Sequence, residues 1–115
     1  MDFLFFEEHE TEENGQDQIR IKDALVQHIV RYENHGYITI LYEEPFAYGG
    51  NIPRLLALNI GPQTVFFDEN RNQIDFTEVC VGMVVEVVAL DQMTYTYPPH
   101  ANAMSVTIMN KLLYN

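Results

Sequence analysis

The stretch "IDFTEVCVGMVVEVVAL", residues 74–90, decides the fold of this 115-residue chain. Its first half suits a single helical turn, because Asp75 or Thr77 can cap the turn and Val79 can point toward a core. Gly82 then supplies a break. The second half, "MVVEVVAL", is too apolar for a strand with one face in water. We therefore predict a short helical turn and then a strand that is buried on both faces or closed in a barrel.

Downstream, a proline loop leads into one more strand. Pro98 and Pro99 carry no amide donor, so they end the preceding ladder and stiffen the loop. The sequence leaves open whether the Tyr97–Pro98 bond is cis or trans. His100 has no evident partner, so we expect no ligand role for it. Residues 101–110 alternate as in a half-buried strand. The apolar positions are Met104, Val106 and Ile108, and the polar ones are Ser105 and Thr107.

Upstream, residues 24–32 and 36–43 are typical of a β-hairpin. Both segments are rich in β-branched residues, and Asn34 and Gly36 suit the tight turn between them. Strand alternation assigns residues to faces. One face of the second strand holds Ile38, Ile40 and Tyr42, opposite Tyr37, Thr39 and Leu41; one face of the first holds Val26, His28, Val30 and Tyr32.

The segments after the hairpin are a loop and more strands. Residues 44–54 contain two prolines and two glycines, which favour a loop. Residues 55–60 and 64–68 are either two short strands or one strand bent at Gly61–Pro62. Residues 69–73 form a polar turn.

This order of elements favours an all-β fold. We expect a small five- to six-stranded antiparallel barrel of the oligonucleotide/oligosaccharide-binding (OB) type, with a short helical turn before the penultimate strand. An open twisted antiparallel sheet or a sandwich is the alternative. Residues 24–115 would form the single domain. Residues 1–23 would form an acidic N-terminal arm, with a loop over 7–18 and a packed apolar segment at 3–6.

The charge of the chain disfavours nucleic acid and anionic membranes as partners. Six Lys and Arg oppose seventeen Asp and Glu, which gives a net charge of −11. Phosphate binding needs clustered basic residues, whereas these are scattered. No apolar run approaches the roughly 20 residues of a membrane span, and the N-terminus lacks the features of a signal peptide. We expect a cytoplasmic protein, unless an export signal has been removed.

The sequence predicts no catalytic centre, metal site or cofactor. Cys80, the only cysteine, lies between two valines and is expected to be a small buried hydrophobe. The four histidines lie in the acidic N-terminal segment, a strand, a turn and a loop, with no metal-ligand spacing. Asp68, Glu69 and Asp75 lack the pattern of a calcium loop.

Tyrosines are the candidate ligand-binding residues. Aromatic faces stack on sugar rings and bases, and OB-type barrels bind ligands on one sheet face and its neighbouring loops. The candidates are Tyr37, Tyr48, Tyr95 and Tyr97. The alternative is that they are ordinary half-buried strand tyrosines.

Two motifs carry a family resemblance. The step from Val79 to Gly82 precedes an alternating strand over 83–89, and the link "YPPHA" begins at Tyr97 and leads to Ala103. This pattern resembles the C-terminal half of a small bacterial domain family of unknown function, which has an OB-type barrel and many lipoprotein-like members. The resemblance implies the fold and no activity, and this chain lacks their lipidation cysteine near its start.

The leading hypothesis is a non-enzymatic binding or protein-interaction module, with a protein or peptide as partner. The alternative is binding of an oligosaccharide or single-stranded nucleic acid on the barrel face. A third hypothesis, an enzyme with an unrecognised centre, is the least favoured, and homo-oligomer formation is compatible with all three.

Overall fold

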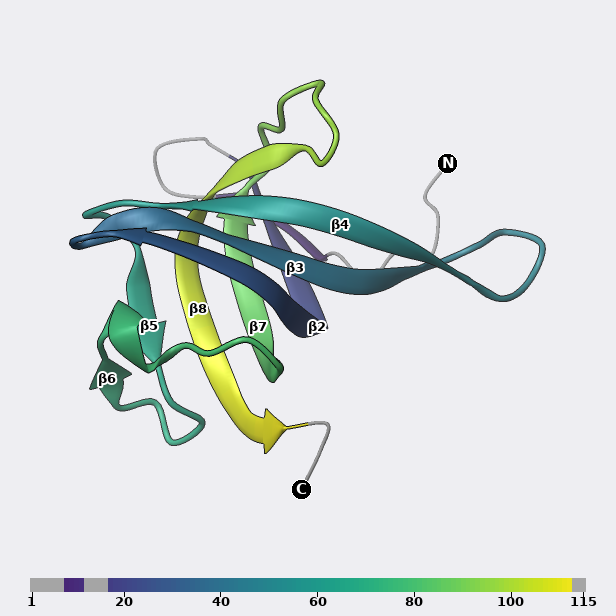
Figure 1. Ribbon diagram of the computed structural model, residues 1–115. Helices are drawn as coiled ribbons and strands as arrows, with labels where there is room; N and C mark the ends of the chain where they lie inside the picture. The colour runs from purple at the N-terminus through teal and green to yellow at the C-terminus, as the bar shows by residue number, and fades with distance from the viewer. Residues whose placement is uncertain (1–7, 12–16, 113–115) are drawn as a thin grey trace.

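The computed structural model describes residues 8–11 and 17–112, which are almost entirely β-structure (Figure 1). Eight strands and one turn of 3-10 helix follow one another along the chain. The strands are β1 (Glu8–Thr11), β2 (Asp17–Tyr32), β3 (His35–Pro45), β4 (Asn51–Ile60), β5 (Val65–Phe67), β6 (Gln73–Ile74), β7 (Met83–Leu90) and β8 (His100–Leu112); the helical turn is η1 (Phe76–Glu78).

Five of the strands pair in a ring. β2 pairs with β3, β3 with β4, β4 with β8, β8 with β7, and β7 again with β2. The contact of Ala57–Asn59 in β4 with residues 100–102 in β8 is parallel, and the other four are antiparallel. The ring is thus mainly antiparallel, as expected, with one short parallel contact. A ring with an odd number of strands cannot alternate direction at every contact, so one pair must be parallel.

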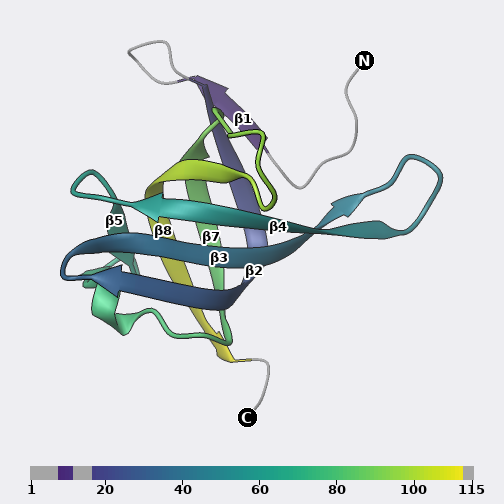
Figure 2. The same ribbon diagram turned by 45° about the horizontal axis from the view of Figure 1, so that its top comes forward.

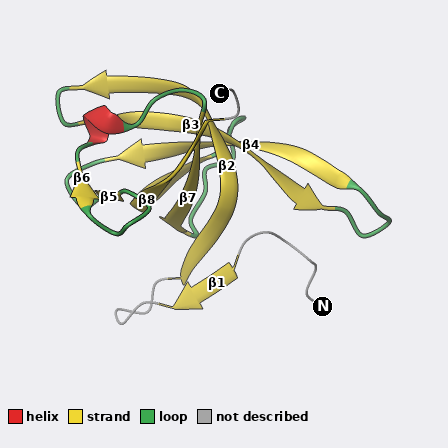
Figure 3. Ribbon diagram, turned by 90° about the horizontal axis from the view of Figure 1, so that it is seen from below, coloured by secondary structure: helices red, strands yellow, loops and turns green. Residues whose placement is uncertain are grey.

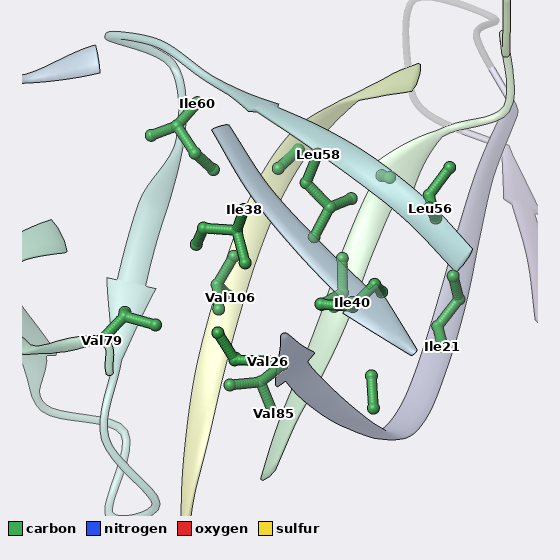
Figure 4. Close-up of a cluster of buried hydrophobic side chains, with 14 of the residues drawn as sticks. Ile21, Val26, Ile38, Ile40, Leu56, Leu58, Ile60, Val79, Val85 and Val106 are labelled. Carbon is green, nitrogen blue, oxygen red and sulfur yellow. The ribbon is translucent and has the colours of Figure 1, made fainter. Parts of the chain in front are cut away.

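The core lies inside this ring, where inward side chains of all five strands meet (Figure 4). Ile38, Ile40 and Tyr42 of β3 are buried, which confirms the predicted face. In β7, Val85, Val87 and Ala89 are fully buried while the alternate residues are half-buried. β7 is thus enclosed on its inner face and partly covered on its outer face.

The β-structure begins before residue 24. Ile19 and Ile21 of β2 are fully buried in the core, so the expected domain boundary at 23/24 cuts through a core strand. Residues 8–11, expected in a loop, form β1 and pair with residues 17–20 of β2. The acidic composition of this segment concealed a strand. The predicted apolar segment at 3–6 lies outside the described residues.

A bulge in β2 changes the face of its C-terminal half. Val26 pairs with Ile40, but His28 pairs with Thr39, so Gln27 is the extra residue. Val26 is buried, whereas His28 is exposed and Ile29 packs against the core. The prediction that Val26 and His28 share a face is therefore wrong, because a bulge breaks the two-residue alternation.

A second irregularity falls between Val88 and Ala89, which pair with Ser105 and Ala103 of β8. The extra residue is Met104, which is half-buried while Val106 and Ile108 are buried as predicted.

Residues 44–54, expected to be a loop, mostly continue β3 and β4. The two strands stay paired from Gly36–Ile60 to Pro45–Asn51 and extend past the ring as a two-stranded projection, which we call the arm (residues 42–54; Figure 2). Pro53 lies within β4, opposite Glu43. Proline is tolerated there because a two-stranded ribbon has an open edge that needs no ladder donor.

The chain turns at Gly61–Pro62 after β4. The segments predicted at 55–60 and 64–68 therefore correspond to two separate strands, β4 and β5, and not to one bent strand. β5 pairs in parallel with residues 105–107 of β8, and it pairs antiparallel with β6. Thr64 fixes the turn, because its hydroxyl donates to Ala103 O at 2.8 Å and accepts from Gly61 N at 3.1 Å.

The helical turn η1 forms where it was predicted (Figure 3). Asp75 occupies the N-cap position but makes no side-chain capping bond. Phe76 and Val79 are buried, and Gly82 has a φ of 96°. Arg31 of β2 holds the turn, because its guanidinium lies 4.7 Å from the centre of the Phe76 ring and donates to Phe76 O and Val79 O.

Cys80 is exposed, which corrects the expectation of a buried residue. Val79 takes the inward position at the end of η1, so Cys80 and Val81 face outward before the chain turns at Gly82 into β7.

Candidate functional site

Tyr37 lies on the outer surface of β3 within a neutral aromatic and amide face. Its ring centre is 6.4 Å from that of His28 on β2 and 6.2 Å from that of His100 on β8. Strand register adds Asn59 of β4 opposite Tyr37, and Asn102 of β8 opposite Asn59. We call these five residues (His28, Tyr37, Asn59, His100 and Asn102) the Tyr37 face.

Hydrogen bonds orient the polar groups of the Tyr37 face. Asn59 Nδ2 donates to Asn102 Oδ1 at 3.1 Å, and Asn59 Oδ1 lies 3.3 Å from His100 Nδ1. An amide oxygen only accepts, so His100 Nδ1 is the donor in this pair. Asn59 is thus the partner of His100 that was not evident from the sequence. The face offers aromatic surface and uncharged hydrogen-bonding groups, which suits a neutral polar ligand.

The loop between β7 and β8, residues 91–99, presents two exposed tyrosines. Thr94 closes its base, because Thr94 N donates to His100 O at 3.1 Å and Thr94 Oγ1 accepts from His100 N at 3.0 Å. The Tyr97–Pro98 bond is cis. The internal hydrogen bonds of the loop use threonine hydroxyls and backbone groups, so the Tyr95 and Tyr97 side chains are left at the surface.

A groove of about 340 Å³ separates this loop from the base of the arm. Met93, Tyr97 and Pro99 form one wall. The other wall comes from Tyr42 and Glu44 of β3 and from Pro53, Arg54 and Leu55 of β4. The two charged side chains pair with each other, because Arg54 Nε donates to Glu44 Oε1 at 2.7 Å.

The tip of the arm is a second aromatic projection. Phe46 N donates to Gly50 O at 2.9 Å and Gly49 N to Phe46 O at 3.0 Å, which closes the turn. The ring centres of Phe46 and Tyr48 are 5.6 Å apart, and both side chains are exposed.

The four predicted tyrosines therefore do not form one platform. Tyr37 belongs to the Tyr37 face, Tyr97 lines the groove, Tyr95 is at the loop surface and Tyr48 is at the arm tip. Sequence reasoning missed His28, Asn59 and Asn102, and it gave His100 no ligand role. Asn59 follows Leu58 in strand alternation and could have been found as an outward residue, whereas the exposure of His28 depends on the bulge.

Over residues 8–11 and 17–112, no three His, Cys, Asp or Glu side chains are placed to hold a metal ion. The carboxylate of Asp68 instead accepts hydrogen bonds from the backbone amides of Asn70 and Asn72, both at 2.9 Å. This carboxylate therefore shapes the turn before β6.

Comparison with known proteins gives no match: no family model, no curated protein and no solved structure is similar to this chain. In the described part of the chain, no helix has the length and apolar character needed to cross a membrane.

Proposed function

We propose that this chain is a non-enzymatic binding module that contacts a protein or peptide through the arm and the 91–99 loop. The observation that carries the proposal is where the aromatic side chains are exposed. Six large hydrophobic side chains are exposed among the described residues, and four of them are Phe46, Tyr48, Tyr95 and Tyr97. Tyrosine and other aromatic residues supply much of the binding energy at protein interfaces.

The scaffold of this module is, by the same proposal, an OB-type barrel of the kind found in the bacterial domain family that the sequence resembles. Support comes from the ring of five paired strands and from the helical turn immediately before β7, the penultimate strand. In such barrels, ligands bind on one sheet face and on the loops that flank it. The Tyr37 face and the 91–99 loop correspond to such a face and such a loop.

Recovery of a specific partner from a lysate of the source cells tests the proposal. The wild-type chain is expected to retain a specific partner. Two double variants, Phe46→Ala/Tyr48→Ala and Tyr95→Ala/Tyr97→Ala, should each bind that partner at least about tenfold more weakly, since an interface aromatic contributes about 2 kcal/mol or more. Tyr32→Ala is the matched control, because Tyr32 is exposed outside both projections. Equal recovery by all variants, or no specific protein, would contradict the proposal.

A second candidate function is binding of a neutral oligosaccharide on the Tyr37 face. The Asn59 and Asn102 amides and the His100 ring beside the Tyr37 ring favour it. A net charge of −11 opposes a nucleic acid but does not affect a neutral sugar.

Titration with cellohexaose, xylohexaose and maltohexaose, with oligo-dT as the anionic comparison, tests this candidate. One sugar is expected to bind, and Tyr37→Ala is expected to weaken that binding about tenfold, since stacking on an aromatic ring contributes about 1–3 kcal/mol. Tyr32→Ala should leave the affinity unchanged. Binding that Tyr37→Ala does not alter would exclude this face.

A further inference from the structure

β4 has an open edge beside the groove. β3 pairs with the whole of β4, from Asn51 to Ile60, whereas β8 pairs only with Ala57–Asn59. In the described part of the chain, residues 51–56 of β4 therefore have a strand neighbour on one side only. The pairing with β8 begins where Ala57 N donates to Pro99 O at 2.9 Å, and before that point the 91–99 loop leaves the edge of β4.

The groove follows this open edge. Leu55 and Pro53 have side chains on one face of β4, and Arg54 has its side chain on the other, yet all three line the groove. Side chains from opposite faces of a strand border the same space when the strand presents its edge to that space. The volume of about 340 Å³ is at the lower end of the 300–1,000 Å³ range typical of ligand pockets.

The backbone groups at this edge follow from the two-residue alternation. Ala57 directs its N–H toward β8, so Leu55 directs its N–H and C=O toward the groove. Pro53 has the same orientation but no N–H, so it contributes only its carbonyl oxygen. The edge thus offers one donor and two acceptors over three residues. This limited pattern opposes extended pairing between two copies, because proline interrupts an edge ladder.

We propose that an extended, basic peptide segment of a protein partner binds in this groove by adding a strand to the edge of β4. The inference rests on the proposed protein-binding function and deepens it. Main-chain hydrogen bonds to Leu55 and Pro53 supply affinity, and contacts with Tyr97, Pro99 and Met93 select side chains, as in other cases of strand addition.

Charge decides that the occupant is a basic peptide and not a second copy of the chain. Two copies, each with a net charge of −11, repel each other, whereas the same field attracts a cationic segment. Glu43 lies opposite Pro53 in the β3–β4 ladder, and its carboxylate accepts a hydrogen bond from the neutral Asn51 amide at 3.2 Å. A Lys or Arg of the peptide can pair with Glu43 without displacing the Arg54–Glu44 ion pair.

A phage-displayed library of random dodecapeptides, selected on the full chain, provides the probe. Selected peptides are expected to be cationic and free of proline at their centre, because a central proline would remove a ladder donor. Leu55→Pro should weaken their binding at least about tenfold, because it removes the N–H that faces the groove while leaving the bonds between β3 and β4 intact. Leu55→Ala is the reference variant, since it also removes the leucine side chain from the groove but keeps the N–H, and it should bind the peptides at least about tenfold better than Leu55→Pro.

If Leu55→Pro does not fold, amide hydrogen exchange on the wild-type chain tests whether a bound peptide covers the edge of β4. Exchange at the Leu55 amide should slow at least tenfold when the selected peptide is bound. The inference is overturned if peptide binding leaves the exchange of the Leu55 amide unchanged, or if Leu55→Pro binds the peptide as well as Leu55→Ala does. It is also overturned if the selection yields no cationic peptide, or if light scattering shows a dimer that Leu55→Pro abolishes. Polypeptide binding that depends on Phe46 and Tyr48 but not on Leu55 would overturn this inference and leave the proposed function standing. If neither the library nor the lysate yields a bound polypeptide, both fail.

Discussion

Replacing Gly36 with alanine is expected to lower the free energy of unfolding by about 2–5 kcal/mol, enough to threaten the fold. A Cβ at this position would lie 1.9 Å from Val30 O, 2.9 Å from Val30 C and 3.1 Å from Arg31 Cα. All three are backbone atoms, so no side-chain rotation can relieve the collision. The φ of 150° is also one that residues with a Cβ rarely adopt.

The position of Gly36 in the ring makes this collision costly. Gly36 pairs with Arg31 of β2 on one side and with Ile60 of β4 on the other. A shift of its backbone would therefore disturb the β2–β3 hairpin and the start of the β3–β4 ladder together. Urea unfolding followed by far-UV circular dichroism measures the loss of stability.

Gly49→Ala is the matched control for Gly36→Ala. Gly49 has a φ of 107°, but a Cβ there would meet no atom within 4 Å. Its substitution should show only the cost of an unfavourable backbone conformation, of order 1–3 kcal/mol, and this cost is confined to the arm tip. If the two variants lose the same stability, steric collision is not what requires glycine at residue 36.

The parts of the fold that depend on local patterns could be predicted from the sequence. Alternation in β3 and the Asn-x-Gly turn located the hairpin, and the stretch from Asp75 to Gly82 located the helical turn with Val79 buried. These features depend on neighbours within a few residues, where side-chain period and turn chemistry leave few alternatives.

Other parts depend on partners far away in the sequence. The bulge at Gln27 interrupts the alternation of β2, and nothing near Gln27 in the sequence signals it. The arm forms because β3 and β4 keep pairing after the ring has closed, so Pro53 lies in a strand although its local sequence favours a loop. The Tyr37 face combines residues of four strands, and its hydrogen bond between Asn59 and His100 spans 41 positions. Of its members, the sequence identified only Tyr37 as a site residue.

Leu56→Ala is expected to lower the free energy of unfolding by about 2–5 kcal/mol, whereas Leu55→Ala should lower it by about 1 kcal/mol or less. Leu56 is fully buried inside the ring, and truncation there removes apolar contacts and leaves a cavity. Leu55, the residue before it, is half-buried on the opposite face and borders the groove. Both substitutions remove the same atoms from the same strand, so differences in helix or strand propensity cancel.

The two losses together show which face of β4 is the interior and whether the Leu55 side chain borders open space. Thermal and urea unfolding of both variants measure the difference, which should exceed about 1 kcal/mol. Equal losses would mean that β4 is covered on both faces, and the groove beside Leu55 would then be closed in solution. A small loss at Leu55 together with a large one at Leu56 means that the Leu55 side chain borders open space, as a peptide bound in the groove requires.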